Sequence, residues 1–152
     1  MIHSVSFETK IGPVTVREED GAIVSVLFRF REEDTDPTPL LQEAKKEILE
    51  YFSGSRKTFD LPLAPKGTMF QKSVWKAIYA IPYGETRSYG DLAKCIGSKG
   101  FQAVGSACGK NPIPIIIPCH RVISSDGTIG GFSGPFDIKV TLLEDEGAHY
   151  RR

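Results

Sequence analysis

Residues 115–122 read IIIPCHRV, and this stretch constrains the chain more than any other. Three consecutive isoleucines belong in a hydrophobic core, because apolar surface is stabilised by leaving water. A thiol, an imidazole and a guanidinium follow at once, at Cys119, His120 and Arg121. Such groups are costly to bury unless they are paired. The stretch therefore predicts a buried segment that ends at a reactive cysteine.

The composition sets the broad class of protein. The chain has 152 residues, of which 40% are hydrophobic and 25% are charged. It can therefore form one ordinary domain, or two small ones, around a real core. No apolar run approaches the roughly 20 residues that cross a bilayer, and the first residues lack the basic and then apolar order of a signal peptide. We expect no membrane partner.

The three cysteines are odd in number and lack the spacing of metal ligands. This usage is typical of free thiols in a reducing compartment, so we expect a cytoplasmic protein, or a nuclear one in a eukaryotic cell. A cysteine after an isoleucine run is more often a small buried hydrophobe than a nucleophile. Cys95 and Cys108, at apolar helix positions, fit that interpretation, whereas the neighbours of Cys119 favour a function.

Charge is unevenly distributed along a chain whose net charge is zero. Residues 1–62 hold 8 Lys/Arg and 12 Asp/Glu, whereas residues 66–125 hold 8 and 2. A basic half on a neutral chain can contact a polyanion through one face. A solvated, lysine-rich surface explains the same numbers equally well, so charge alone does not decide between the two.

The first half has the pattern of a small α+β unit. Alternating apolar residues indicate one strand at 4–10, and two more strands flank a Glu-Glu-Asp-Gly turn that ends at Gly21. A helix then follows, with Thr38 as its N-cap, Pro39 at its first position and Gly54 just after its end.

A polar, proline-marked passage near residues 60–66 predicts a junction between a domain at 1–62 and a second domain at 66–152. Beyond it, a T-x-x-Q capping box at residues 68–71 opens a helix. The apolar stripe of that helix consists of Phe70, Val74, Trp75 (or Ala77) and Ile78.

Two tightly joined helices come next. Ser88 and Asp91 cap the first, and the second covers FQAVGSACGK and ends before Asn111. A helix pair inside a basic region favours a helix-turn-helix, although many small helix pairs never meet DNA. The glycine-rich SSDGTIGGFSGP then forms a loop or wing. A last helix, at about 136–146, carries Ile138, Leu142 and Leu143.

A cysteine attacks only as its thiolate, so Cys119 needs a base or a positive charge nearby. His120 is adjacent, yet neighbouring side chains of an extended segment point to opposite faces. Either the backbone turns at Pro118-Cys119 or a water bridges the thiol and the imidazole. An acid that orients the imidazole is also expected. The candidates in this half are Glu85, Asp91, Asp126, Asp137, Glu144, Asp145 and Glu146. The last three end the final helix, which could return an acid to the site.

Taken together, these residues resemble the 6-O-alkylguanine-DNA alkyltransferases, also called methylated-DNA–protein-cysteine methyltransferases. The resemblance is dense from Gly67 to Gly147, through GTMFQKSVWKAI, IPYGETRSYGDLA, AVGSACGKNPIPIIIPCHRVI, GTIGGFSG and LLEDEG. The first half is similar more loosely, through IGPVTV and EYFSG. The family implies an α/β (α+β) fold, with a small ribonuclease-H-like N-terminal domain and a winged-helix-like (helix-turn-helix) C-terminal DNA-binding domain.

The resemblance also implies catalytic residues. Cys119 would accept the alkyl group, and His120 would act on it through a water while Glu146 holds the imidazole. Asn111 would stabilise the turn between the recognition helix and the active-site strand, and Tyr89 would donate a hydrogen bond to the guanine ring. A thioether is a very poor leaving group, so each molecule would act once, without a metal or an organic cofactor. Because Glu146 ends a helix, where negative charge is unfavourable, its substitution could even stabilise the fold.

Further residues are implied at the substrate and at the DNA. Ser133 would contact the alkylated oxygen, and the backbone at Cys119 and Val122 would read the exocyclic amine. The residues expected at the DNA are Gln71, Ser98, Gln102, Arg121 and Ser125. The partner would be double-stranded DNA with 6-O-alkylguanine, or less readily 4-O-alkylthymine, flipped out of the stack. A monomer is expected.

Two positions depart from the family pattern. The family usually has an arginine that fills the gap left by the flipped base, and this chain has Gln102 there. Phe101, beside it, is either an apolar wedge, a device of proteins that kink DNA, or a core residue of its own helix. Phe132 stands where tyrosine is common, which removes a hydroxyl.

Three other functions compete with this interpretation. A non-catalytic relative that binds alkylated DNA would lack the acceptor, and the presence of Cys119 argues against it. A winged-helix regulator would leave IPCHRV without a role. A Cys-His hydrolase would need turnover and an oxyanion site that the sequence does not supply.

Overall fold

The chain folds into two compact units, Met1–Lys66 and Gly67–Arg152. The structure is a computed structural model that describes residues 2–30, 37–97, 100–130, 132 and 134–150. Within these residues, no helix is both long enough and apolar enough to span a membrane.

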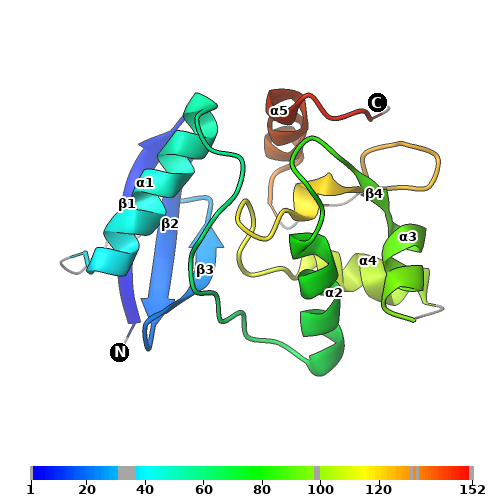
Figure 1. The fold of residues 1–152 in the computed structure, drawn as a ribbon, viewed down its shortest axis with the longest axis horizontal. Helices are drawn as coiled ribbons and strands as arrows, with labels where there is room; N and C mark the ends of the chain where they lie inside the picture. Colours follow the sequence, from blue (N-terminus) through cyan, green and yellow to red (C-terminus); the bar gives the residue numbers. More distant parts are fainter. Residues whose placement is uncertain (1, 31–36, 98–99, 131, 133, 151–152) are drawn as a thin grey trace. The chain divides into compact units, whose positions relative to one another are not determined.

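The first unit is an antiparallel sheet covered by one helix (Figure 1). Its strands are β1 (Ile2–Thr9), β2 (Gly12–Glu19) and β3 (Ala22–Leu27), which pair in the order β1-β2-β3. Helix α1 (Pro39–Ser53) packs against β1 and β2. The side chains that fill the space between helix and sheet are fully buried, and they include Val14, Val16, Ile23, Leu41, Ala44 and Ile48.

Local sequence explains where these elements begin and end. Asp20 and Gly21 both have positive φ, 52° and 80°, as the two central residues of a type I′ hairpin turn require. The predicted turn is therefore confirmed. At the helix, Thr38 accepts a hydrogen bond from the N–H of Leu41 at 3.1 Å, and Gly54 adopts the left-handed conformation just after the last turn. The predicted start and end of α1 are confirmed as well.

The first unit extends beyond residue 62, where the predicted N-terminal domain ended. The N–H of Ile23 donates to the carbonyl of Pro62, and the N–H of Ala64 donates to the carbonyl of Ile23, both at 2.8 Å. These bonds place Leu63 parallel to β3. Residues 62–64 satisfy the backbone N–H and carbonyl of Ile23 on the outer edge of β3, so the first part of the polar passage belongs to the first unit.

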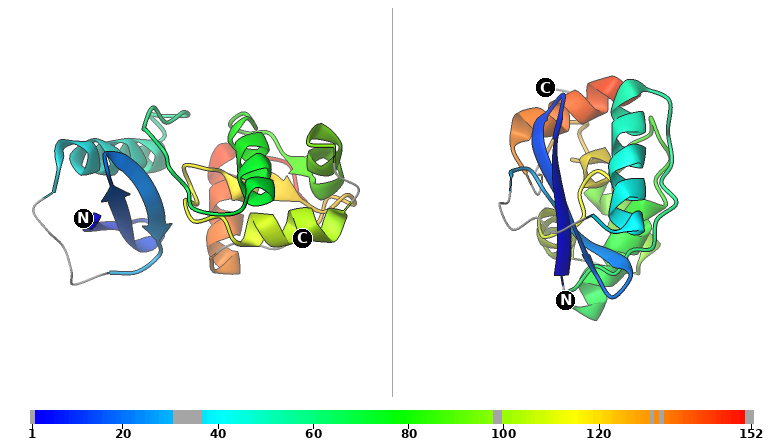
Figure 2. Two further views of the ribbon diagram at one scale, coloured as in Figure 1. Left: turned by 90° about the horizontal axis from the view of Figure 1, so that it is seen from below. Right: turned by 90° about the vertical axis from the view of Figure 1, so that its left-hand side faces the viewer.

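The second unit consists mainly of short helices (Figure 2). Its elements are α2 (Met69–Tyr79), β4 (Arg87–Ser88), α3 (Tyr89–Cys95), α4 (Phe101–Gly109), the 3₁₀ helix η1 (Cys119–Arg121), β5 (Val122–Ile123) and α5 (Phe136–Glu146). Helices α2, α3 and α4 pack against one another, and α5 packs against η1. Strands β4 and β5 pair in parallel. Helices α3 and α4 are the two helices that the sequence predicted.

The capping signals of this unit are confirmed, but two burial predictions are wrong. Both capping boxes form, Thr68 with Gln71 and Ser88 with Asp91. Phe70 was expected in the core and is 37% exposed, because the core contact of α2 is made further along the helix. Cys95 was expected to be buried and is exposed. It is the last residue of a seven-residue helix whose buried side chains are Leu92 and Ala93.

Trp75 joins α2 to α4. Its indole N–H donates to the carbonyl of Ala107 at 2.8 Å, and its side chain is only 2% exposed. Gly67 lies directly against the ring, because a Cβ at that position would be 2.5 Å from Cη2 of Trp75 and 2.6 Å from Oε1 of Gln71. No side chain fits there unless the indole or the capping glutamine moves.

Gly67→Ala should therefore lower the free energy of unfolding by about 1–3 kcal/mol, the usual cost of overpacking a tight contact. Gly109→Ala is the matched control, because a Cβ at Gly109 meets nothing within 4 Å. We expect that control to be neutral, or to gain about 0.4–1 kcal/mol from a less flexible unfolded chain. Urea unfolding of the three proteins measures both effects. Equal stability of the two variants would contradict the packing described for Trp75.

Candidate active site

The segment between α4 and η1 is buried although it is neither helix nor strand. Its four isoleucines, Ile113, Ile115, Ile116 and Ile117, are at most 3% exposed. Ile115 has φ of 74°, a left-handed conformation that a β-branched residue rarely adopts. Such strain persists only where the surrounding packing enforces it. The isoleucine run thus holds a strained turn immediately before the cysteine.

Asn111 ties this segment to the end of α4. Its Nδ2 donates to the carbonyl of Ile117 at 2.8 Å, and its Oδ1 accepts from the N–H of Ile113 at 3.0 Å. Its own N–H donates to the carbonyl of Cys108 at 3.3 Å. The side chain is 4% exposed, so these bonds form away from water. Asn111 makes the contacts that a hinge between helix and active-site segment needs.

The backbone turns sharply at Pro118. This residue has φ −81° and ψ 65°, the values of an inverse γ-turn, and the N–H of Cys119 donates to the carbonyl of Ile117 at 2.8 Å. Cys119, His120 and Arg121 then form one turn of 3₁₀ helix. The turn at Pro118-Cys119 that the sequence left open therefore occurs, and it is compatible with a water between the thiol and the imidazole. Cys119 and His120 are 1% and 0% exposed.

Glu146, the last residue of α5, binds this turn through two neighbouring side chains. Its Oε2 lies 2.7 Å from Nε2 of His120. Nε and Nη2 of Arg121 donate to its Oε1 and Oε2 at 2.9 and 3.0 Å, and the N–H of Gly84 donates to Oε1 at 3.2 Å. Among the seven acids considered from the sequence, Glu146 is the carboxylate that meets His120.

This arrangement fixes the protonation of His120. Burial alone would raise the pKa of Glu146, but hydrogen bonds from His120 and Arg121 lower it well below its usual range. Burial lowers the pKa of His120, and the bond to Glu146 opposes that shift only in part. A neutral imidazole beside a carboxylate donates its Nε2–H. Nδ1 is then left as an acceptor, and it is buried with no hydrogen-bond partner among the described residues.

The burial of Arg121 argues against its prediction as a DNA contact. The residue is 6% exposed, and its Nη1 donates to the carbonyl of Ile81 at 2.6 Å while Nε and Nη2 donate to Glu146. The guanidinium is the counter-charge of a buried carboxylate. The same pairing corrects the expectation that loss of Glu146 could stabilise the fold, because it would leave Arg121 buried and unpaired.

Lys139 belongs to the site, although the sequence-based prediction did not include it. The side chain is fully buried, and its Nζ donates to the carbonyl of Val122 at 2.7 Å. Burial lowers the pKa of Lys139 to about 8, and the thiols of Cys119 and Cys108 oppose this shift. A positive charge therefore lies near the thiol of Cys119, where it favours the thiolate.

The signal for Lys139 was present in the sequence. It stands three and four residues before Leu142 and Leu143, on the apolar face of the last helix, and a lysine on such a face is rarely buried without a role. Cys108, by contrast, is inert. Burial, with a further contribution from Cys119, raises the pKa of Cys108 to about 12, so it stays a neutral thiol.

Tyr89, the first residue of α3, lies between two glycines. A Cβ at Gly105 of α4 would be 3.9 Å from the ring, and a Cβ at Gly130 would be 2.8 Å from the hydroxyl. Val122 is fully buried in β5; its N–H donates to the carbonyl of Cys119, and its own carbonyl accepts from Lys139. A carbonyl has two lone pairs, so that of Val122 can accept one more bond.

The other predicted contact residues differ in their exposure. Gln102 and Ser125 are exposed, as a DNA contact requires. Gln71 is partly buried, and its Oε1 accepts from the N–H of Thr68 in the capping box. Ser98 and Ser133 lie outside the described residues.

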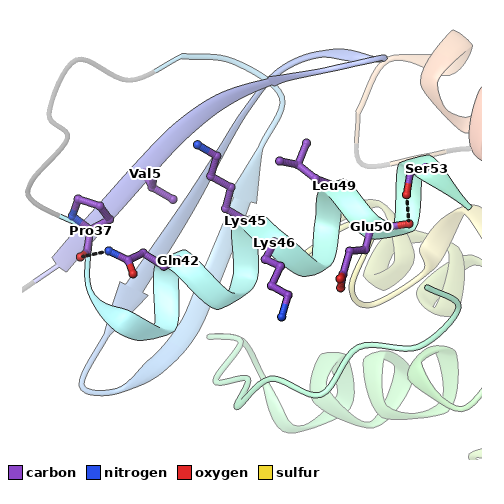
Figure 3. A pocket seen from close by; sticks show the side chains of 8 residues that line it. All are labelled: Val5, Pro37, Gln42, Lys45, Lys46, Leu49, Glu50 and Ser53. Atoms are coloured by element: carbon purple, nitrogen blue, oxygen red, sulfur yellow. Dashed lines mark hydrogen bonds between the residues drawn. The ribbon is translucent and has the colours of Figure 1, made fainter. Parts of the chain in front are cut away.

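A pocket of 570 Å³ lies along α1 in the first unit (Figure 3). Its lining residues are Val5, Pro37, Gln42, Lys45, Lys46, Leu49, Glu50 and Ser53. They include no predicted site residue and neither a thiol nor an imidazole. The polar groups at its two ends bond to the backbone, Gln42 to Pro37 at 3.4 Å and Ser53 to Glu50 at 2.9 Å. Among the described residues, no cluster of three His, Cys, Asp or Glu side chains could hold a metal ion.

The fold and the site therefore define a two-domain α/β protein in which a buried cysteine directly precedes a buried imidazole–carboxylate pair, in a unit of short packed helices. Two family models cover nearly the whole chain. The model of the 6-O-methylguanine DNA methyltransferase ribonuclease-like domain matches residues 2–65, and that of the DNA binding domain of the same family matches residues 69–148. The chain belongs to the 6-O-methylguanine DNA methyltransferase family.

Individual relatives agree over almost their full length. The constitutive methylated-DNA–protein-cysteine methyltransferase of Bacillus subtilis is 43% identical, and the alignment covers 99% of each chain. The Methanosarcina acetivorans protein of that name is 44% identical over 93% of this chain and 96% of its own. The crystal structure of Mycobacterium tuberculosis OGT in complex with DNA has a TM-score of 0.86 at 41% identity, over 95% of this chain and 92% of that one.

Lys139→Met should raise the free energy of unfolding at pH 7 by about 1–4 kcal/mol, because an apolar side chain of similar length replaces a buried ammonium. The same change should slow any reaction that needs the Cys119 thiolate. Burial holds the folded pKa of Lys139 at about 8, below the value of about 10.4 in the unfolded chain. The unfolded state binds more protons between these values, so wild-type stability rises with pH there.

The stability advantage of Lys139→Met should therefore shrink above about pH 8. Urea unfolding of both proteins from neutral to alkaline pH measures this difference. A variant that is less stable than wild type at pH 7, or whose advantage grows with pH, would contradict the buried ammonium.

Proposed function

We propose that this chain repairs alkylated DNA directly, by moving the alkyl group of 6-O-alkylguanine in double-stranded DNA to Sγ of Cys119. 4-O-alkylthymine is a poorer substrate. One observation carries the proposal: Cys119 follows a tight turn beside a neutral His120, whose Nε2 is held by Glu146 and whose Nδ1 has no partner among the described residues. Relatives that match over the full length carry the name of this reaction.

The proton of the thiol goes to His120. Nδ1 of His120 takes it through a bridging water, and Glu146 stabilises the imidazolium that results. Arg121 keeps the carboxylate of Glu146 in place through two hydrogen bonds. The ammonium of Lys139 adds a positive charge near Cys119. The site therefore produces a thiolate without exposing the sulfur to solvent.

The thiolate attacks the alkyl carbon in line with the bond to O6. The S–C bond forms as the O–C bond breaks, and the electron pair of that bond stays on the guanine. A hydrogen bond from the hydroxyl of Tyr89 to the guanine ring stabilises this charge, and the absence of a side chain at Gly105 and Gly130 leaves room for the ring of Tyr89. The electrophile is already present in the substrate, so the reaction needs neither a metal nor an organic cofactor. The thioether product is stable, and each molecule acts once.

The substrate base must leave the duplex to reach Cys119, a residue that is 1% exposed, because in-line attack is impossible inside the base stack. Helix α4, with exposed Gln102 at its start, and exposed Ser125 are the described parts that would meet the DNA. The excess of Lys/Arg between residues 66 and 125 favours this contact. One chain contains every group that the reaction uses, so a monomer suffices.

Cys119→Ser should abolish alkyl transfer and leave DNA binding intact, because a serine hydroxyl is not ionised by His120 at neutral pH. Cys95→Ser is the matched control, since Cys95 is an exposed thiol of the same unit. The intact mass of each protein after incubation with methylated duplex DNA, followed by peptide mapping, measures the transfer. One added methyl group on Cys119 is expected. An alkyl group on Cys95 or Cys108 would overturn the assignment.

His120→Gln and Glu146→Gln should each slow transfer about 100-fold, within the range of general-base catalysis. The double variant should be hardly slower than the worse single variant, because the two residues act as one unit. Single-turnover rates on the same methylated duplex measure all four proteins, and circular dichroism checks their fold. Losses that multiply in the double variant would refute a shared relay.

A further inference from the structure

Phe101 is the first residue of α4 and is 60% exposed. This exposure excludes the alternative in which it packs in the core of its own helix. One exposed phenylalanine is ordinary on a protein surface, so exposure alone does not indicate a function. The position of Phe101 does indicate one, because its ring lies near Gly90, the residue after Tyr89.

Phe101 and Tyr89 lie on the same side of α4. Phe101 precedes Gly105 by four residues and therefore shares its helix face, and the ring of Tyr89 packs on Gly105. A Cβ at Gly90, the residue after Tyr89, would be 3.6 Å from Cε1 of Phe101 and 3.7 Å from Oγ of Ser125. Phe101, Ser88 and the exposed Ser125 thus meet at Gly90, the residue after Tyr89, which has no side chain to separate them.

The charge around this point suits a nucleic acid. The first turn of α4 has no acidic residue, and Gly100 offers no side chain to cap its N–H groups. The positive end of α4 favours a phosphate near Phe101, and the excess of Lys/Arg in residues 66–125 favours a polyanion as the partner of this unit. Gln102, the neighbouring exposed side chain, is neutral and shorter than the arginine usual in the family. The occupant that fits an aromatic ring flanked by anion-binding groups is a stacked pair of bases.

We propose that Phe101 fills the space that the alkylated base leaves in the duplex and stacks on the bases that flank it. The proposal rests on the function proposed above. In this role the ring of Phe101 stabilises the duplex from which the alkylated base has been flipped out. Stacking on an aromatic ring does not depend on base identity, so Phe101 can act at any sequence. Phe101 is a positioning residue, because it touches neither the alkyl group nor the sulfur.

Two substrates distinguish a role of Phe101 in refilling the duplex stack from a general role in DNA binding or alkyl transfer. The first is a duplex with one 6-O-methylguanine, and the second is the same modified strand alone, which has no duplex stack to refill. Phe101→Ala should lower the single-turnover rate on the duplex about tenfold, the lower end of what one lost base–aromatic stack costs. It should leave the rate on the single strand unchanged. Phe101→Trp should restore the duplex rate, and the melting temperatures of both variants should match wild type.

Phe136→Ala is the matched control. Phe136 is also a phenylalanine at the first position of a helix in the same unit, and it is also 60% exposed. We expect it to leave both rates unchanged. An equal loss on the two substrates with Phe101→Ala, or the same duplex-specific loss with Phe136→Ala, would overturn the wedge while leaving alkyl transfer intact. Failure of wild-type Cys119 to gain a methyl group would instead overturn the proposed function.

Discussion

The carboxylate of Glu146 is the group on which the site depends. It closes α5 at a helix end that disfavours negative charge, and the two hydrogen bonds from Arg121 compensate for that position. The same two oxygens also bind His120 and the N–H of Gly84. One buried group therefore joins α5, η1 and the connection between α2 and β4. Removing one partner of such a buried pair typically lowers the free energy of unfolding by about 3–5 kcal/mol. The interaction that orients His120 therefore also stabilises the fold.

Burial also assigns different protonation states to groups that lie close together. It keeps Cys108 a neutral thiol with a pKa of about 12, and it lowers the pKa of both His120 and Lys139. A neutral imidazole can then take a proton, while an ammonium remains beside Cys119 at neutral pH. Ile115, with its strained φ, lies in the segment just before Cys119. Backbone strain and buried ionisable groups both reduce stability, and in proteins such costs cluster at functional sites.

Local signals in the sequence predicted most of the fold. The Asp-Gly turn, the two capping boxes and the helix that ends at Gly54 each depend on a few neighbouring residues, and all are present. The wrong predictions concern tertiary contacts. The family resemblance implied a DNA contact for Arg121, but its side chain binds Glu146, which is distant in the sequence. Lys139 was overlooked because a lysine in a helix pattern is usually solvated. Phe70 and Cys95 lie at helix ends, where periodicity does not show where packing stops.

We propose that Glu146 holds His120 as a neutral base with its proton on Nε2. Nitrogen-15 NMR of labelled protein tests this directly, because the two ring nitrogens have different shifts when protonated and when bare. We expect that, around neutral pH, His120 shows a protonated Nε2 and an unprotonated Nδ1, and that Glu146→Gln weakens this preference. A proton on Nδ1, or a fully protonated imidazolium at pH 7, would contradict this role of Glu146, because in neither form can Nδ1 accept the proton of Cys119.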